Sequence, residues 1–213
     1  MLKTTITDDL CKICSLIKRL IKRIFHLKID DTELSIVEYL RQCGAQIGEN
    51  VDFVDSGCNF KDATCLQIGN NVTLSGTKIL THDASLRKFI GNNCNKIGRV
   101  VIGNNVFVGV NSVILPNVRI GNNVIIGSGS VVSKNIPDNS VAVGNPIRII
   151  CSCDEYIAKH MERMNNPKNV FWNLPRKDMT PEERQKFNKD IDGRIVYLCD
   201  SNQPQIKYVP WKK

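Results

Sequence analysis

The chain has 213 residues, 42% of them hydrophobic, and a formal net charge of +8. This length is enough for one domain with its own core and some appended segments. The sequence has no run of 18 apolar residues and no evident signal peptide, which argues against a membrane-spanning helix and against secretion.

The surplus positive charge lies at the two ends of the chain. Residues 1–30 carry seven Lys/Arg against three acids, residues 151–213 carry twelve against nine, and the middle carries ten against nine. No basic face interleaved with aromatic residues is visible, so a nucleic-acid partner is not expected. The nine cysteines are scattered without a disulfide framework, which favours reduced thiols and a cytoplasmic location. Cys11/Cys14 and Cys151/Cys153 lack a second pair at zinc-site spacing, so no metal is expected.

Residues 1–43 are predicted to form an N-terminal helical segment. Apolar residues recur at spacings of three and four over residues 8–28, with Lys and Arg on the other face, which indicates an amphipathic helix. We expect it to cap the open end of the following domain or to pack between subunits. Peripheral contact with an anionic membrane surface is the alternative. A short helix over residues 33–42 follows.

Residues 102–136 repeat with a period of six. Ile or Val opens each unit, and Gly follows in four of the six units. Such units favour a short β-strand and a tight turn, because Gly and Asn tolerate positive φ. Ile102-Gly-Asn-Asn returns 18 residues later at Ile120, so three units should make one triangular coil. Stacked coils would bury the aliphatic residues in one continuous core.

The spacing of the repeats also predicts an inserted loop. The coils begin at Ile47 and are irregular up to Ile68, and Ile68 and Ile102 are 34 residues apart, one coil plus about 16 residues. The insertion therefore falls within residues 81–101, and loops on a rigid scaffold commonly carry function. It contains His82, the only histidine of the coil region, and an Ile90-Gly-Asn-Asn run that is out of phase with the repeat.

The C-terminal residues 151–213 are predicted to form a helical extension. A helix is expected over residues 153–165, and another from Pro181 to about Asp190, opened by the capping box Thr180-Pro-Glu-Glu183. A loop bearing Phe171 and Trp172 lies between them, and residues 195–198 suit a strand. His160 is expected to be a surface or packing residue.

Residues 44–150 resemble the hexapeptide-repeat acyltransferases. Three features carry the resemblance: the sixfold repeat, the His-bearing inserted loop, and the closing run Val143-Gly-Asn-Pro-Ile-Arg-Ile149. Within this superfamily the chain resembles the maltose and galactoside O-acetyltransferases and the sugar O-acetyltransferases of capsule and O-antigen synthesis. The resemblance implies an all-β fold, a single-stranded left-handed parallel β-helix with helical segments at both ends. Its handedness would be an exception to the right-handed crossover rule.

The resemblance also implies a reaction, the transfer of an acetyl group from acetyl-CoA to a hydroxyl of a sugar or polysaccharide precursor. His82 matches the general base, whose imidazole must be neutral and whose second ring nitrogen needs an acceptor. Asp83 adjoins it, but neighbouring side chains of an extended chain point in opposite directions. We therefore expect Asp83 to contact the acceptor sugar or to brace the loop. Asn59 is a second candidate for the acceptor site, and the oxyanion donor is expected to be an unspecified backbone N–H.

Acetyl-CoA is expected to lie along the coils, in a groove between subunits of a homotrimer. The family motifs place the following residues on it: Gly109, Val110, Ser128, Ser133, Lys134 and Arg148. Val110 stands where the family usually has Ser or Ala, although a backbone contact would survive that change. Arg148 is suited to a CoA phosphate.

Other functions are compatible with the same fold. N-acetylation of an amino-sugar nucleotide, or of a small acceptor such as serine, is a close enzymatic alternative. A metal hydratase would need three histidines on the coil faces, and only His82 is there. A non-catalytic trimeric assembly module is the alternative of a different class.

Overall fold

The computed structural model of the chain describes residues 35–54, 62–90 and 94–201. The chain divides into two compact units, residues 1–39 and 40–213. Helix α2, Ile36–Gln42, lies within the short helix predicted over residues 33–42 and begins one residue after the first described residue, Ser35. The predicted basic helix over residues 8–28, its membrane contact, and Asn59 all lie outside the described residues.

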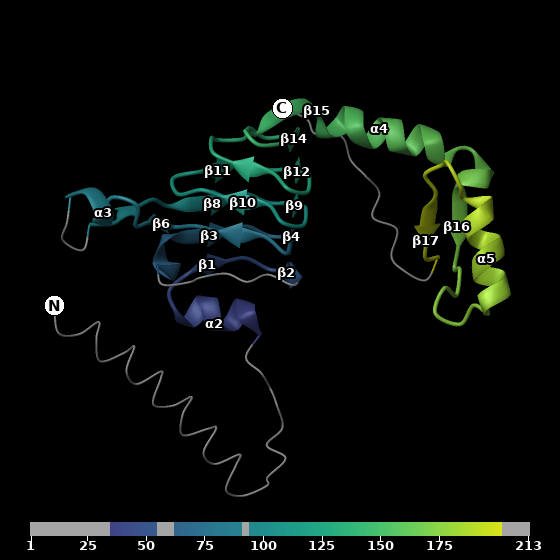
Figure 1. The fold of residues 1–213 in the computed structure, drawn as a ribbon, viewed down its shortest axis with the longest axis horizontal. Coiled ribbons are helices and arrows are strands. Elements are labelled where there is room, and N and C mark those ends of the chain that lie inside the picture. Colours follow the sequence, from purple (N-terminus) through teal and green to yellow (C-terminus); the bar gives the residue numbers. More distant parts are fainter. Residues whose placement is uncertain (1–34, 55–61, 91–93, 202–213) are drawn as a thin grey trace, which may run out of the picture. The chain divides into compact units, whose positions relative to one another are not determined.

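Three parallel sheets form the body of the second unit, and the chain visits them in rotation (Figure 1). The first contains β1 (Gln46–Ile47), β3 (Leu66–Ile68), β8 (Val100–Ile102) and β11 (Arg119–Ile120). The second contains β2 (Val51–Val54), β4 (Val72–Ser75), β9 (Val106–Val108), β12 (Val124–Ile126) and β14 (Ser140–Val143), with β15 (Arg148–Ser152) antiparallel at its edge. The third contains β5 (Lys78–Ile79), β10 (Val113–Ile114) and β13 (Val131–Val132).

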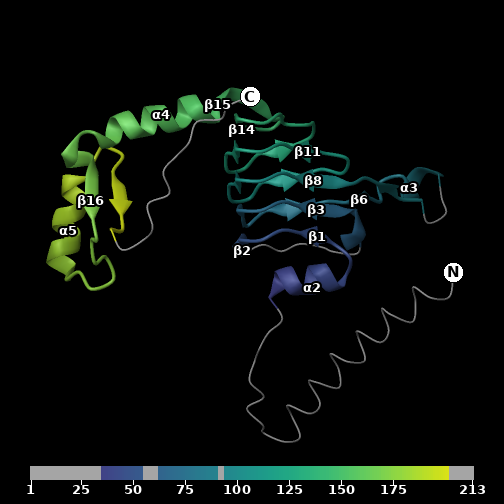
Figure 2. The same ribbon diagram turned by 180° about the vertical axis from the view of Figure 1, so that it is seen from behind.

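The strand register confirms the coil predicted from the repeat. Ile102 pairs with Ile120, 18 residues further on, and Ile68 pairs with Ile102, which places the extra residues between them as expected. Figure 2 shows β1, β3, β8 and β11 stacked in this order. The opening aliphatic residues are buried, each contributing roughly 1.5–3 kcal/mol to the stability of the core.

The Gly-Asn-Asn turns explain why the same three residues recur from coil to coil. The first Asn links the coils, since Oδ1 of Asn104 accepts the N–H of Asn70 at 2.8 Å. The second Asn takes a left-handed φ, 55° at Asn105, which Asn tolerates better than most residues. Its Nδ2 donates to Oδ1 of Asn123 at 3.0 Å. Side-chain hydrogen bonds of this kind form two ladders along one corner of the stack, which set the coils in register.

The inserted residues leave the coils as an arm (Figure 1). Strand β6, His82–Asp83, pairs antiparallel with β7, Lys96–Ile97, and the helical turn α3, Arg87–Ile90, follows β6. The arm is tied at its root, where the N–H of Gly98 donates to the carbonyl of Thr81 at 2.8 Å. Ile90 belongs to α3 and not to a coil strand, in agreement with its phase in the sequence.

The C-terminal extension contains the two predicted helices, α4 (Cys153–Met164) and α5 (Pro181–Asp190). The prediction of a loop at Phe171 and Trp172 is wrong. They belong to β16, Val170–Trp172, which follows the 3-10 turn η2 (Pro167–Asn169) and pairs in parallel with β17, Tyr197–Cys199. A three-residue strand is too short to show a period, so its partner 27 residues later decides its conformation.

His160 is a packing residue of this extension, as predicted. Its ring centroid lies 4.4 Å from that of Tyr156, and its Nδ1 lies 2.7 Å from Oη of Tyr197. None of the helices in the described ranges has the length and apolar character needed to cross a membrane.

Candidate active site

His82 stands where the chain leaves the coils for the arm. Strand β5 is held in the third sheet by the pairing of Ile79 with Ile114, and Thr81 behind it is buried. The coil therefore fixes the point from which β6 departs, and the His82 side chain is 25% exposed there. A partly covered imidazole on a tethered strand is well placed for proton transfer.

Asp62 is the residue that approaches the second ring nitrogen of His82. Its Oδ2 lies 2.9 Å from Nδ1, and its side chain is 31% exposed. The separation is that of a hydrogen bond, but the N–H···O angle is too bent for one, and the buried Nδ1 has no aligned partner among the described residues. Catalytic hydrogen bonds are often misaligned before substrate binds and tighten in the complex, so this geometry is compatible with a hydrogen bond between Asp62 and His82 during the reaction.

Asp83 braces the arm and does not orient the histidine. Its Oδ2 lies 2.5 Å from Nζ of Lys96, and its Oδ1 accepts the N–H of Ser85 at 2.8 Å. The hydrogen bond from Lys96, then those from Ser85, lower the pKa of the Asp83 carboxyl from 3.8 to about 2. A direct contact of Asp83 with an acceptor sugar stays a prediction.

Two of the predicted cofactor-binding segments meet at one corner of the coils. Gly109 follows β9 and Ser128 follows β12, and the N–H of Gly129 donates to the carbonyl of Val110 at 2.9 Å. A Cβ on Gly109 would lie 2.6 Å from the backbone nitrogen of Ser128, so only Gly allows this approach of the coils. The corner therefore has no side chain at Gly109, beside an exposed Val110 and an exposed Ser128.

The other predicted segment shares a corner with His82. The N–H of Leu80 donates to Ile114, and the N–H of Leu115 donates to Val132, so Leu80, Leu115 and the exposed Ser133–Lys134 follow one another on adjoining coils. His82 thus lies two coils, roughly 10 Å along the axis, from Ser133. The third sheet separates this corner from that of Gly109.

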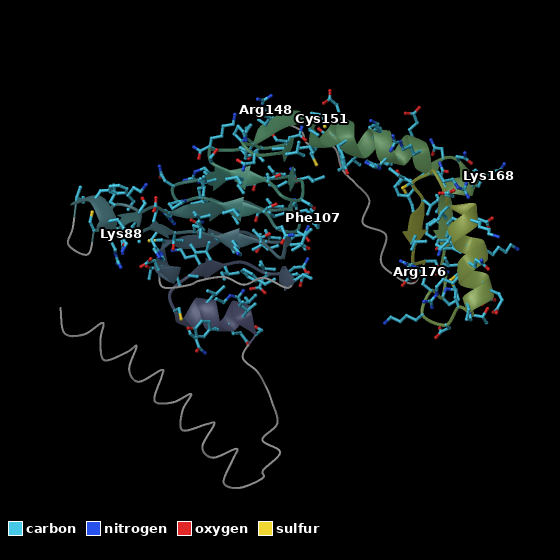
Figure 3. All side chains as sticks on the ribbon, viewed as in Figure 1. Lys88, Phe107, Arg148, Cys151, Lys168 and Arg176 are labelled. Atoms are coloured by element: carbon cyan, nitrogen blue, oxygen red, sulfur yellow. The ribbon has the colours of Figure 1, made fainter. Side chains whose placement is uncertain are left out.

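Arg148 opens β15 on the last coil, where its side chain is exposed (Figure 3). The predicted cofactor residues therefore lie at the two corners beside the third sheet and, for Arg148, at the edge of the second sheet. Within the ranges that the structure describes, no three His, Cys, Asp or Glu side chains are grouped to hold a metal ion. The six described cysteines are free thiols.

Comparison with known proteins identifies the family. The family model "Bacterial transferase hexapeptide (six repeats)" matches residues 99–134. Protein CapG of Staphylococcus aureus is 40% identical over 157 residues, which cover 71% of this chain and 90% of CapG. The chain belongs to the hexapeptide-repeat transferases. As a member of this family, the protein is an enzyme, as the sequence predicts.

Two solved structures similar to this hexapeptide transferase are acetyltransferases. The maltose O-acetyltransferase from Clostridium difficile 630 is 34% identical, with 63% of this chain and 83% of that chain covered and a TM-score of 0.44. A galactoside acetyltransferase in complex with coenzyme A is 28% identical, with 60% and 76% covered and a TM-score of 0.39.

Asp62 is a residue of the candidate site that the sequence analysis missed. It lies in the irregular stretch before Ile68, next to the 3-10 turn η1, Ala63–Cys65. Counting six residues back from Ile68 reaches Asp62, just as six back from Ile120 reaches Ile114. A carboxylate at a position that elsewhere opens a unit with Ile or Val was the available signal.

Proposed function

We propose that this transferase moves the acetyl group of acetyl-CoA to a hydroxyl of a sugar or polysaccharide precursor, with His82 as the general base. The approach of Asp62 Oδ2 to His82 Nδ1 is the observation that carries the proposal. A carboxylate beside Nδ1 favours the tautomer with the proton on that nitrogen. The lone pair of Nε2 is then free to accept a proton from the acceptor.

The reaction requires one proton relay and one bond exchange. Nε2 of His82 takes the hydroxyl proton as the acceptor oxygen attacks the thioester carbon. The oxyanion that forms needs an N–H donor. When the C–S bond breaks, the thiolate takes the proton back from Nε2, so that the products are the acetyl ester and CoA thiol.

The proposed path of CoA runs along the third sheet. It begins at His82, passes between the corner of Gly109 and that of Ser133, and ends near Lys134 and Arg148. The exposed cations at its far end suit phosphate groups, and the corner at Gly109, which has no side chain, suits a backbone contact with the pantetheine arm.

The finer features of the fold belong to the same proposal. We expect the coils to be left-handed and the protein to be a homotrimer. Phe107 supports the trimer, because it lies on the outward face of β9, is 46% exposed, and stands in register with Ile125 of β12. An apolar column on an outer face is typical of a subunit interface.

Substitution of the general base tests the function. His82→Ala should lower kcat by at least roughly 10²-fold and leave oligomeric state and CoA binding unchanged, because the imidazole acts in the proton transfer. His160→Ala, in the C-terminal extension, is the control and should retain activity. Thiol release measures turnover, and mass spectrometry of the product separates an ester from an amide. Unchanged turnover of His82→Ala would remove the catalytic assignment.

A further inference from the structure

The arm that carries His82 is the basic part of the transferase domain. Residues 81–101 contain four Lys/Arg and one acid, Asp83. Lys96 is paired with Asp83, and Arg99 donates through Nη2 to the neutral Oε1 of Gln67 at 2.6 Å. Arg87 and Lys88 remain exposed on α3, and no acidic side chain in the described ranges lies within ion-pair distance of them. The arm therefore presents uncompensated positive charge.

This charge is within reach of the imidazole. Arg87 is five positions after His82, so their Cα atoms are at most about 17 Å apart, and the antiparallel pairing of β6 with β7 restrains the start of the intervening chain. Phe89, which follows Lys88, has 84% of its surface exposed. Adjacent cationic and aromatic side chains can hold a phosphate and stack on a planar base.

The CoA phosphates already have candidate partners elsewhere. Lys134 and Arg148 lie on the C-terminal coils, past β13 and β14, whereas the arm departs after β5. Figure 3 shows Lys88 on α3 and Arg148 on the last coil at separate places. The charge of the arm is thus left for the acceptor.

We propose that the acceptor is a sugar bearing a phosphate or pyrophosphate, held by Arg87 and Lys88 of the arm while its hydroxyl meets His82. This inference rests on the proposed acetyl transfer and names its substrate class. The phosphate could belong to a simple sugar phosphate or to a nucleotide-linked sugar. Only the nucleotide would add a stacking contact with Phe89.

A matched ligand series tests the proposal by equilibrium binding and by turnover. The probes are glucose, glucose 1-phosphate, UDP-glucose and glucuronic acid, each titrated calorimetrically into the full-length protein at two salt concentrations. We expect glucose 1-phosphate or UDP-glucose to bind at least about 10-fold more tightly than glucose, and the gain to fall with salt. Equal binding of glucose and both phosphorylated probes would overturn the proposal, as would preference for glucuronic acid.

Variants of the arm assign the effect to its residues. R87Q/K88Q should weaken the phosphorylated probes about 10-fold and leave the KM for acetyl-CoA unchanged. The matched control K168Q/R176Q removes two exposed charges from the C-terminal extension. It should change neither the affinity for the phosphorylated probes nor the KM for acetyl-CoA. If the acceptor is a nucleotide sugar, Phe89→Ala should weaken the binding of UDP-glucose and leave that of glucose 1-phosphate unchanged. If Phe89→Ala does not weaken the binding of UDP-glucose, the acceptor is assigned as a simple sugar phosphate. A raised KM for acetyl-CoA in R87Q/K88Q would show that Arg87 and Lys88 bind the donor and not the acceptor, and would overturn the inference.

The binding measurements test the substrate class separately from the catalytic mechanism. If His82→Ala retains full turnover, the proposed mechanism fails, yet the binding preference can still hold. If His82→Ala is inactive but the four probes bind alike, only the substrate class fails.

Discussion

Asp62 and His82 show how the fold brings together two side chains that lie 20 positions apart in the sequence. Asp62 comes from the turn before β3, and His82 from the first strand of the arm, so neighbouring coils bring them together. Asp83, the sequence neighbour of His82, faces Lys96 instead. In an extended chain the adjacent residue is on the wrong face, and only a residue from another coil can reach Nδ1.

The role of Asp62 can be tested by amide substitution. Asp62→Asn should lower kcat at least about 10-fold, but less than His82→Ala, because the imidazole loses the acceptor that fixes its tautomer. The KM for acetyl-CoA should not change. Asp62→Glu should restore part of kcat, which a purely structural role would not predict, and Asp52→Asn in β2 is the control. Full activity of Asp62→Asn would contradict the positioning role.

Gly109 carries a second prediction at this scale. Gly109→Ala should destabilise the protein by about 1–3 kcal/mol and raise the KM for acetyl-CoA, because the new Cβ would lie 2.6 Å from the nitrogen of Ser128. The control is Gly129→Ala, where no atom lies within 4 Å but φ is +69°, so only the backbone cost of about 1 kcal/mol applies. Denaturant midpoints and initial rates measure both effects. Equal behaviour of the two variants would show that the coil contact is unimportant.

The arm is an element whose conformation depends on a few contacts at its root and stalk. Backbone pairing of His82 with Ile97 and the ion pair between Asp83 and Lys96 hold its two strands together. Loops of this kind have few buried contacts and open more readily than a packed core. The geometry of the arm therefore depends on the charge of Asp83, which is lost when its carboxyl is protonated at low pH.

The pH dependence of this brace follows from the lowered pKa of Asp83. A carboxyl with a pKa of about 2 in the folded arm and 3.8 when unfolded stabilises the arm above pH 3.8, and this contribution is lost as the pH falls through about 2. Asp83→Asn should therefore increase hydrogen exchange of the β6 and β7 amides near neutral pH, and the difference from the unaltered protein should disappear toward pH 2. Carboxyl NMR of Asp83 gives its midpoint directly, and a value near 3.8 would rule out the brace.

At the scale of the whole molecule, the stacked coils leave their outer faces to be covered. The alternation along β9 buries Val106 and Val108 in the core and turns Phe107 outward. A coil stack cannot bury both faces of a strand by itself, because the interior takes only every second residue. Association of subunits would remove the remaining apolar side chains from water.

The homotrimer is testable through Phe107. The unaltered protein should be a trimer by light scattering at micromolar concentration. Phe107→Asp should shift it toward smaller species, because a buried unpaired carboxylate at an interface is costly. Trp172→Asp, which changes a similarly exposed aromatic residue of β16, should keep the trimer. A monomeric unaltered protein would contradict the assembly.

The coils were predictable because their determinants are local and repeated. A period of six, with Gly-Asn-Asn at the turns, specifies strand, turn and register together, and the phase difference between Ile68 and Ile102 located the arm. The capping box at Thr180 marked the start of α5 for a similar reason, since a cap needs only residues within one turn. Strand β16 carried no such signal, because three residues pair only with a distant segment.

The sequence by itself determined the coiled architecture, the family, and His82 as the candidate base, since a short repeat and a single inserted histidine are written in adjacent residues. The tertiary structure alone decided that Asp62 meets the imidazole and that Asp83 braces the arm. It also decided that the cofactor candidates divide between two corners. These contacts depend on which residues of different coils stack on one another. Asp62 lies in the irregular turn before β3, where the sequence does not follow the six-residue repeat and so does not predict the stacking.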